Sequence, residues 1–136
     1  MTWSWTDAWL LTAAYVTNEN RVTLTALIGA GDALNHAIFT DVELEQGLAK
    51  LSAAGLAQWD GNVITLTEKA LHLCGEAVES TQYIREAMSK IDEELRLVDL
   101  TAADLTPIEL DTDAVDAAIA AYHARARAWL REHQAD

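Results

Sequence analysis

Few residues with reactive or metal-binding side chains stand at spacings that would bring them together. The candidates are four histidines and one cysteine, namely His36, His72, His123, His133 and Cys74. His72 and Cys74 lie two positions apart, which on a helix turns their side chains about 200° away from each other. Asp32 and His36 share a helix face, but two ligands do not complete a metal site. We therefore expect no bound metal ion and no cofactor.

The acidic run at residues 111–116 is similar to a calcium-binding loop only at its start. A loop of that kind needs an oxygen ligand where Val115 stands and a glycine where Asp116 stands. Capping of the following helix explains these acids better. The glycine-rich phosphate loops and the nucleophile elbow are missing from the sequence, and Cys74 falls on an apolar helical stripe that is typical of a core. The sequence thus predicts a protein that is not an enzyme.

Charge and composition exclude several classes of protein. The 136 residues carry 9 Lys and Arg against 22 Asp and Glu, a net charge of −13, which argues against wide non-specific contact with nucleic acid or an anionic membrane. Hydrophobic residues make up 51% of the chain, enough for the core of one domain. No apolar run reaches the roughly 18 residues of a membrane-spanning helix. With one cysteine and no signal-peptide pattern, we expect a cytoplasmic location.

The first half of the chain has clear helix and turn signals. A helix is expected from Thr6 to Val16 and is apolar on nearly every face, so it needs cover on more than one side. Thr23 can cap a second helix. Thr40 and Glu43 form a capping box that opens a third helix over residues 41–54, whose core side is Leu44, Leu48 and Leu51.

A short hairpin follows the third helix. Gly55 is placed to end that helix, and an Asp60-Gly61 turn separates two β-favouring stretches within residues 57–66. The run Glu43–Leu56, the Asp60-Gly61 turn and the run Ile64–Ala70 together resemble the end of a winged-helix domain. Over residues 6–75 the chain is similar to bacterial regulators of the MarR and PadR type. The fold expected is mainly α with a small β-hairpin, a winged helix-turn-helix followed by a helical C-terminal extension.

In the DNA-binding members of that superfamily the third helix enters the major groove and the wing touches the DNA backbone. The resemblance therefore implies a DNA or partner face made of Glu45, Gln46, Ala49, Lys50, Trp59 and Asn62. The outward side of helix 41–54 holds three carboxylates and one ammonium, and residues 1–75 carry 3 positive and 8 negative side chains, 3 − 8 = −5. Because phosphate repels carboxylates, we expect a protein-interaction module of regulator-like ancestry. The alternative is a dimeric DNA-binding transcriptional regulator that reads through Gln46 and Lys50.

The second half is expected to be a helical extension, so that residues 1–80 form the winged-helix domain and residues 81–136 the extension. Apolar residues step by three and four along two helices, and they form a candidate dimer seam of Ile84, Met88, Ile91, Leu95, Tyr122 and Trp129. A homodimer is expected from this seam. The alternative is that the same residues pack on the helix at residues 7–16 within one chain.

Two further groups of residues leave alternatives open. Five tryptophans, Trp3, Trp5, Trp9, Trp59 and Trp129, either expose binding hot spots or fill space between the helix at residues 7–16 and the C-terminal helices. Three arginines near the C-terminus, Arg125, Arg127 and Arg131, are explained by the dipole of the last helix or by a phosphate-binding patch. We favour the dipole.

Overall fold

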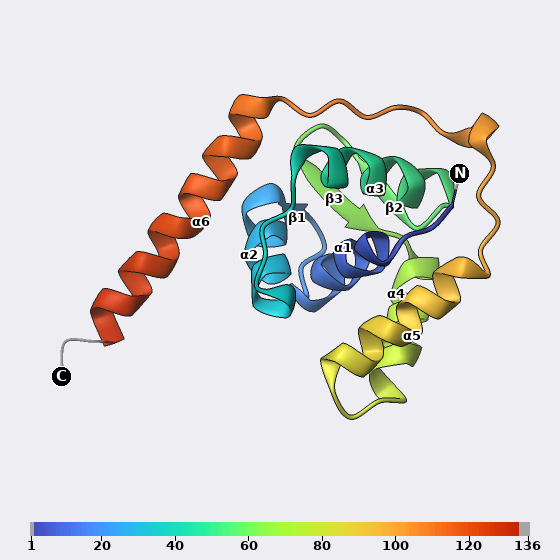
Figure 1. The fold of residues 1–136 in the computed structure, drawn as a ribbon, viewed down its shortest axis with the longest axis horizontal. Coiled ribbons are helices and arrows are strands. Elements are labelled where there is room, and N and C mark those ends of the chain that lie inside the picture. The colour runs from blue at the N-terminus through green and yellow to red at the C-terminus, as the bar shows by residue number, and fades with distance from the viewer. Residues whose placement is uncertain (1, 134–136) are drawn as a thin grey trace.

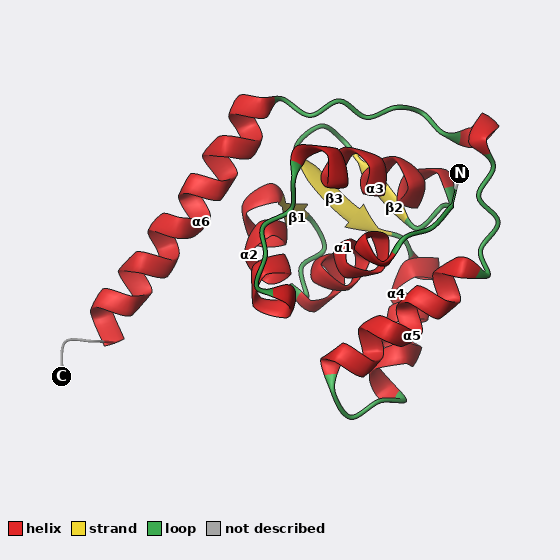
Figure 2. Ribbon diagram, in the orientation of Figure 1, coloured by secondary structure: helices red, strands yellow, loops and turns green. Residues whose placement is uncertain are grey.

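The computed structural model describes residues 2–133, and within this range the chain forms six α-helices, one 3₁₀ turn and three short strands (Figure 1). The elements in chain order are α1 Trp5–Val16, β1 Val22–Thr23, α2 Leu24–Asn35, α3 Asp41–Ala53, β2 Ala57–Trp59, β3 Val63–Leu66, α4 Glu68–Glu79, α5 Ile84–Arg96, η1 Ala102–Asp104 and α6 Thr112–His133. The expected class, mainly α with a small β-hairpin, is confirmed (Figure 2).

The sheet has the strand order β1-β3-β2 and both pairings are antiparallel. The hairpin turn falls at Asp60-Gly61 as predicted, and Gly61 has a φ of 102°, which a side chain would strain. Ile64 of β3 lies between Val22 of β1 and Trp59 of β2 in register. The sequence predicts a short extended piece at Arg21-Val22, but its pairing with β3 was not predicted, because a two-residue strand has no periodicity to reveal it.

Most helix ends follow the capping signals. The Thr40–Glu43 capping box forms, and Thr23 accepts a hydrogen bond from the Ala26 amide as the cap of α2. The expectation for α1 was wrong by two residues. Its N-cap is Ser4 rather than Thr6, because the Asp7 carboxylate reaches back to the Ser4 amide at 2.8 Å.

Helix α1 is the centre of the core and is covered by α2, α3 and α5 on different sides. Leu10 and Leu11 are almost completely buried, as expected for a helix that is apolar on nearly every face. The Trp9 indole donates to the Gly31 carbonyl at 2.9 Å and stacks on Phe39, which fastens α1 to α2. Leu44, Leu48 and Leu51 of α3 are all buried and form its core side as predicted.

The segment before α1 is fastened to the end of α5. The Trp3 indole donates to the Val98 carbonyl at 3.0 Å, across 95 positions of sequence, and Arg96 donates to the Trp3 carbonyl at 3.5 Å. Trp3 is 6% exposed. This tryptophan therefore fills space between the first helix and the later helices, which was one of the two alternatives.

The last helix lies apart from the others along its second half. Val115 and Ala118 of α6 are buried against α2, and the helix then continues past α2 away from the body (Figures 1 and 2). The residues between η1 and α6 run in an extended connector along the outside of α3 (Figure 1). Helices α1 to α5 thus form one core, and α6 packs at the edge of this core.

Candidate interaction surface

The outward face of α3 is the surface that the sequence singled out for DNA or a partner. Gln46 is exposed there, as expected, and Glu45 is half-buried. Two other members of this face are not outward at all, since Ala49 is 4% exposed and Lys50 is 8% exposed. The prediction that Ala49 and Lys50 would be presented to solvent is therefore wrong.

Lys50 is buried because it forms an ion pair with α1. Its ammonium lies 2.6 Å from Asp7 Oδ2, and both side chains are almost entirely enclosed. The same ammonium donates to the Thr2 carbonyl at 3.3 Å, and Asp7 Oδ2 also accepts from the Ser4 amide. Lys50 is thereby neutralised and directed inward, so it is in no position to contact a phosphate group.

The connector covers the rest of this face. We call residues 105–110 the strap. The Leu110 amide donates to Glu45 Oε2 at 2.9 Å, which holds the end of the strap against α3. Pro107 and Ile108 face Gln46 across a cavity of about 540 Å³. Ile108 also borders a second cavity of about 390 Å³ on the side of Trp59. The strap therefore passes over α3 with a hollow on either side of it.

The turn of the wing pairs with a cation from the segment before β1. Arg21 lies 3.3 Å from Asp60 Oδ2 at the hairpin turn, and both side chains are exposed. Hydrogen bonds from the Val63 and Asn62 amides hold the pKa of Asp60 below its usual value, and the Arg21 charge adds to this effect. Asn62 is exposed at the tip, whereas Trp59 is half-buried. The wing thus presents a carboxylate and an amide group at its tip.

The residues of the predicted dimer seam lie in different surroundings. Met88, Ile91 and Leu95 are fully buried inside the chain, where α5 packs on α1 and α4. An exposed seam along α5 is therefore wrong for these three residues. These three residues pack within one chain, as the other alternative predicted.

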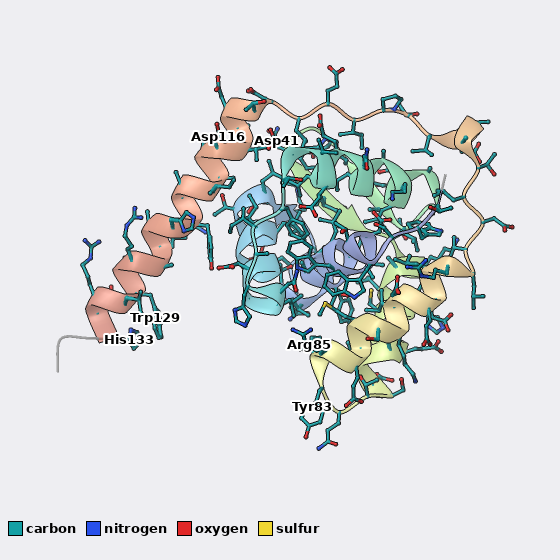
Figure 3. The ribbon with its side chains drawn as sticks, viewed as in Figure 1. Asp41, Tyr83, Arg85, Asp116, Trp129 and His133 are labelled. Carbon is teal, nitrogen blue, oxygen red and sulfur yellow. The ribbon has the colours of Figure 1, made fainter. Side chains whose placement is uncertain are left out.

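Tyr122 and Trp129, the α6 members of the predicted seam, remain near the surface. The Tyr122 hydroxyl donates to Asp32 Oδ2 at 2.5 Å, which fastens α6 to α2 and raises the pKa of that tyrosine. Trp129 is 57% exposed and stacks only on His133 of its own helix (Figure 3). Ile84 is 40% exposed at the start of α5.

Sequence reasoning missed the two polar contacts that shape this surface. Asp7 and Lys50 are 43 positions apart, and Asp32 and Tyr122 are 90 apart, so no local spacing links either pair. An aspartate at the start of a helix is explained by the helix dipole alone, so nothing in the sequence near Asp7 pointed to a distant partner. The one local hint that Lys50 is buried was its position next to Leu51, which lies on the core side of α3.

No protein-family model matches the chain, and no similar curated protein or solved structure was found. Across residues 2–133, His, Cys, Asp and Glu side chains form no group of three or more that is arranged to hold a metal ion. In the same range, every helix is too short or too polar to cross a membrane.

Proposed function

We propose that the chain is a non-enzymatic winged-helix module that works through contacts with protein rather than by reading DNA. The order of elements from α1 to β3 supports the winged-helix assignment, because it is helix, strand, helix, helix and hairpin, with β1 completing the sheet. The fold alone does not decide between protein contact and DNA contact.

The observation that carries the proposal is the state of the α3 face. Base reading requires a helix that can lie in the major groove with exposed donor side chains. On α3 the one cation, Lys50, is enclosed in an ion pair with Asp7, and the strap lies over the residues beside it. A DNA duplex that approached the exposed Gln46 would also meet the strap, which lies across a cavity from it.

Charge supports the same conclusion. Glu45 is among the polar groups of the α3 face that remain accessible, and Asp60 lies at the wing tip. A phosphate backbone would therefore meet carboxylates. A buried thiol at Cys74 suits a reducing compartment, and we propose the cytoplasm as the site of action.

A fluorescence-anisotropy titration with random-sequence duplex DNA at low salt tests the proposal. Proteins that bind DNA retain non-specific dissociation constants of about 10⁻⁴–10⁻⁶ M at physiological salt, and tighter ones when salt is lowered. We expect no rise in anisotropy with the native chain up to its highest soluble concentration. Salt-sensitive binding that is lost in Gln46→Glu would overturn the proposal.

The alternative, a dimeric DNA-binding regulator, is favoured by one observation, the exposure of Gln46 at the centre of α3. It requires the strap to move. A variant with Glu45→Ala and Ile108→Ser loosens the strap, and DNA binding by this variant alone would identify a masked reading helix. The matched control is Glu109→Ala, which removes an exposed strap carboxylate that makes no contact with α3 among the hydrogen bonds of the described residues.

A further inference from the structure

The far half of α6 is an unpartnered helix face. The apolar stripe that begins with the buried Val115 and Ala118 continues without a break to Trp129 and Leu130, which are 57% and 47% exposed. We call residues 123–133 the arm. It extends for about 16 Å at 1.5 Å per residue. The stripe that fastens α6 to α2 therefore continues into a segment that no other part of residues 2–133 covers.

The arm differs in charge from the rest of the chain. It holds three arginines and one glutamate, 3 − 1 = +2, whereas residues 1–122 hold 6 cations and 20 carboxylates, 6 − 20 = −14. A basic helix with an exposed Trp could also suit an anionic membrane or a nucleic acid. The attached body, with its charge of −14, would be repelled by the extended surface of either polyanion, whereas contact with a second copy, whose own net charge is −13, can be confined to the arm and one acidic patch.

An acidic groove of matching character lies between α4 and α5. Its volume is about 580 Å³, and Leu73 and Ala77 contribute an apolar floor. Its charged rim consists of Glu76, Glu79, Glu93, Glu94 and Lys90, a net charge of 1 − 4 = −3. We call it the acid groove. It offers carboxylates for the arginines of the arm and apolar surface for its tryptophan.

The arm belongs to α6 and the acid groove to α4 and α5, and these elements lie on opposite flanks of the body (Figure 1). Figure 1 shows the end of α6 and the α4–α5 pair projecting toward the same side of the body, with α1 and α2 between them. Figure 3 shows Trp129 and His133 at the end of α6 and Tyr83 at the tip of the α4–α5 pair. The arm is a continuation of a straight helix and does not reach the groove of its own chain. In a pair of copies related by a two-fold axis, the arm of each copy would meet the groove of the other.

From this arrangement we propose that two copies of the chain form a reciprocal dimer in which the arm of each docks in the acid groove of the other. The proposal rests on the proposed function and names its partner as a second copy. Pairing of two arms with each other is disfavoured, because both carry a charge of +2. Arm and groove attract, and the same contact covers Trp129 and Leu130.

Sedimentation equilibrium of the full native chain gives the first measurement. At about 100 μM protein, well above a micromolar dissociation constant, we expect twice the mass of one chain. The dimer should dissociate more readily as salt rises above about 0.1 M, where charges are increasingly screened. A monomer at every accessible concentration would overturn the inference.

Charge reversal then locates the contact. The arm variant is Arg127→Glu with Arg131→Glu, and the groove variant is Glu76→Arg with Glu93→Arg. Each alone should raise the dimer dissociation constant about tenfold or more. An equimolar mixture of the two variants should form a heterodimer. In it, one contact joins an unchanged arm to an unchanged groove, and the other joins the reversed arm to the reversed groove, whose charges are again opposite. Far-UV circular dichroism checks that both variants are folded.

Matched controls change exposed charges elsewhere, namely Arg21→Glu and Glu19→Arg, and should leave the dissociation constant unchanged. A native dimer that survives in both reversed variants, or a mixture that stays monomeric, would show that the contact is not between arm and groove. These outcomes differ from a failure of the proposed function. DNA binding would refute the function whatever the oligomeric state, whereas a monomer without DNA binding refutes only this inference.

Discussion

The ion pair between Asp7 and Lys50 decides what the α3 surface presents. Both side chains are removed from water, so the loss of one partner leaves the other charge buried without compensation. We expect Lys50→Met to lower the free energy of unfolding by about 3 kcal/mol. Urea unfolding followed by tryptophan fluorescence measures this loss.

Lys69→Met serves as the control for that substitution. Lys69 is exposed and donates only to the Ala54 carbonyl, so its loss should cost less than about 0.5 kcal/mol. Asp7→Asn combined with Lys50→Met should recover part of the stability that Lys50→Met loses, since no unpaired charge is left. A cost below about 1 kcal/mol for Lys50→Met would mean that the pair is open to solvent.

Cys74 should be an inert thiol. Burial raises its pKa to about 12 from 9.0, so the thiolate is scarce in the folded protein. The thiol of the unfolded chain loses its proton at a lower pH than the buried thiol of the folded chain. The contribution of Cys74 to stability is therefore fully present below about pH 9 and is lost as the pH rises to about 12.

A thiol reagent at about pH 8 should consequently modify the native chain far more slowly than the urea-unfolded chain. Absorbance of the released chromophore follows the reaction. Equal rates in the two states would contradict the burial of this side chain.

At the scale of elements, the packing of Phe39, in the loop after α2, depends on the absence of a side chain at Gly31. A Cβ there would lie 2.3 Å from the ring of the buried Phe39. We expect Gly31→Ala to destabilise the chain by about 1–3 kcal/mol, although alanine favours a helix. The midpoint of urea unfolding measures the effect.

Gly75→Ala is the matched substitution in another helix. The nearest atom to its added Cβ would be the Tyr15 hydroxyl oxygen at 3.5 Å, an ordinary contact distance. Here the helix preference of alanine should dominate and stabilise the chain by up to about 1 kcal/mol. If both variants lost equal stability, close packing of Phe39 against Gly31 would not be the cause.

The elements themselves were largely predictable because their signals are local. The Thr40–Glu43 capping box, the leucine repeat of α3 and the Asp60-Gly61 turn each act within a few residues. The surface of α3 was not predictable in this way. Helical periodicity places Ala49 and Lys50 outward, and their cover comes from the strap and from residues before α1, which no spacing within α3 reveals.

At the scale of the whole molecule, α6 is a structure in two halves. Removal of residues 123–136 takes away Trp129 and Leu130, which are exposed, and leaves the bond between Tyr122 and Asp32 in place. We expect the truncated chain to unfold within about 0.5 kcal/mol of the full chain at concentrations where both are monomeric. Thermal unfolding by circular dichroism compares them.

The matched control is truncation after residue 111, which removes Val115 and Ala118 together with the rest of α6. Both residues are buried against α2, so this longer truncation should destabilise the chain by several times more. If removal of the arm alone cost more than about 2 kcal/mol, the arm would have to pack on its own body.

For α6 the sequence left two alternatives, a dimer seam or packing on the helix at residues 7–16, and within the chain it packs on α2, which neither alternative named. Its apolar residues recur at the same helical spacing from Val115 to Trp129. This spacing does not show at which residue of α6 the partner helix ends. The division at Tyr122 follows from the length of α2, which has 12 residues against the 22 of α6. Burial of the α5 residues likewise depends on α1, which lies about 70–90 positions earlier in the chain.

The bond between Trp3 and the Val98 carbonyl has a consequence for synthesis on the ribosome. The partner of Trp3 is made 95 positions later, and α5, which covers one side of α1, is completed just before it. At about 5–20 residues per second, α1 therefore remains uncovered on that side for several seconds while the chain grows. During that time its apolar surface is available to chaperones, and native closure of the core must wait until Val98 has left the exit tunnel.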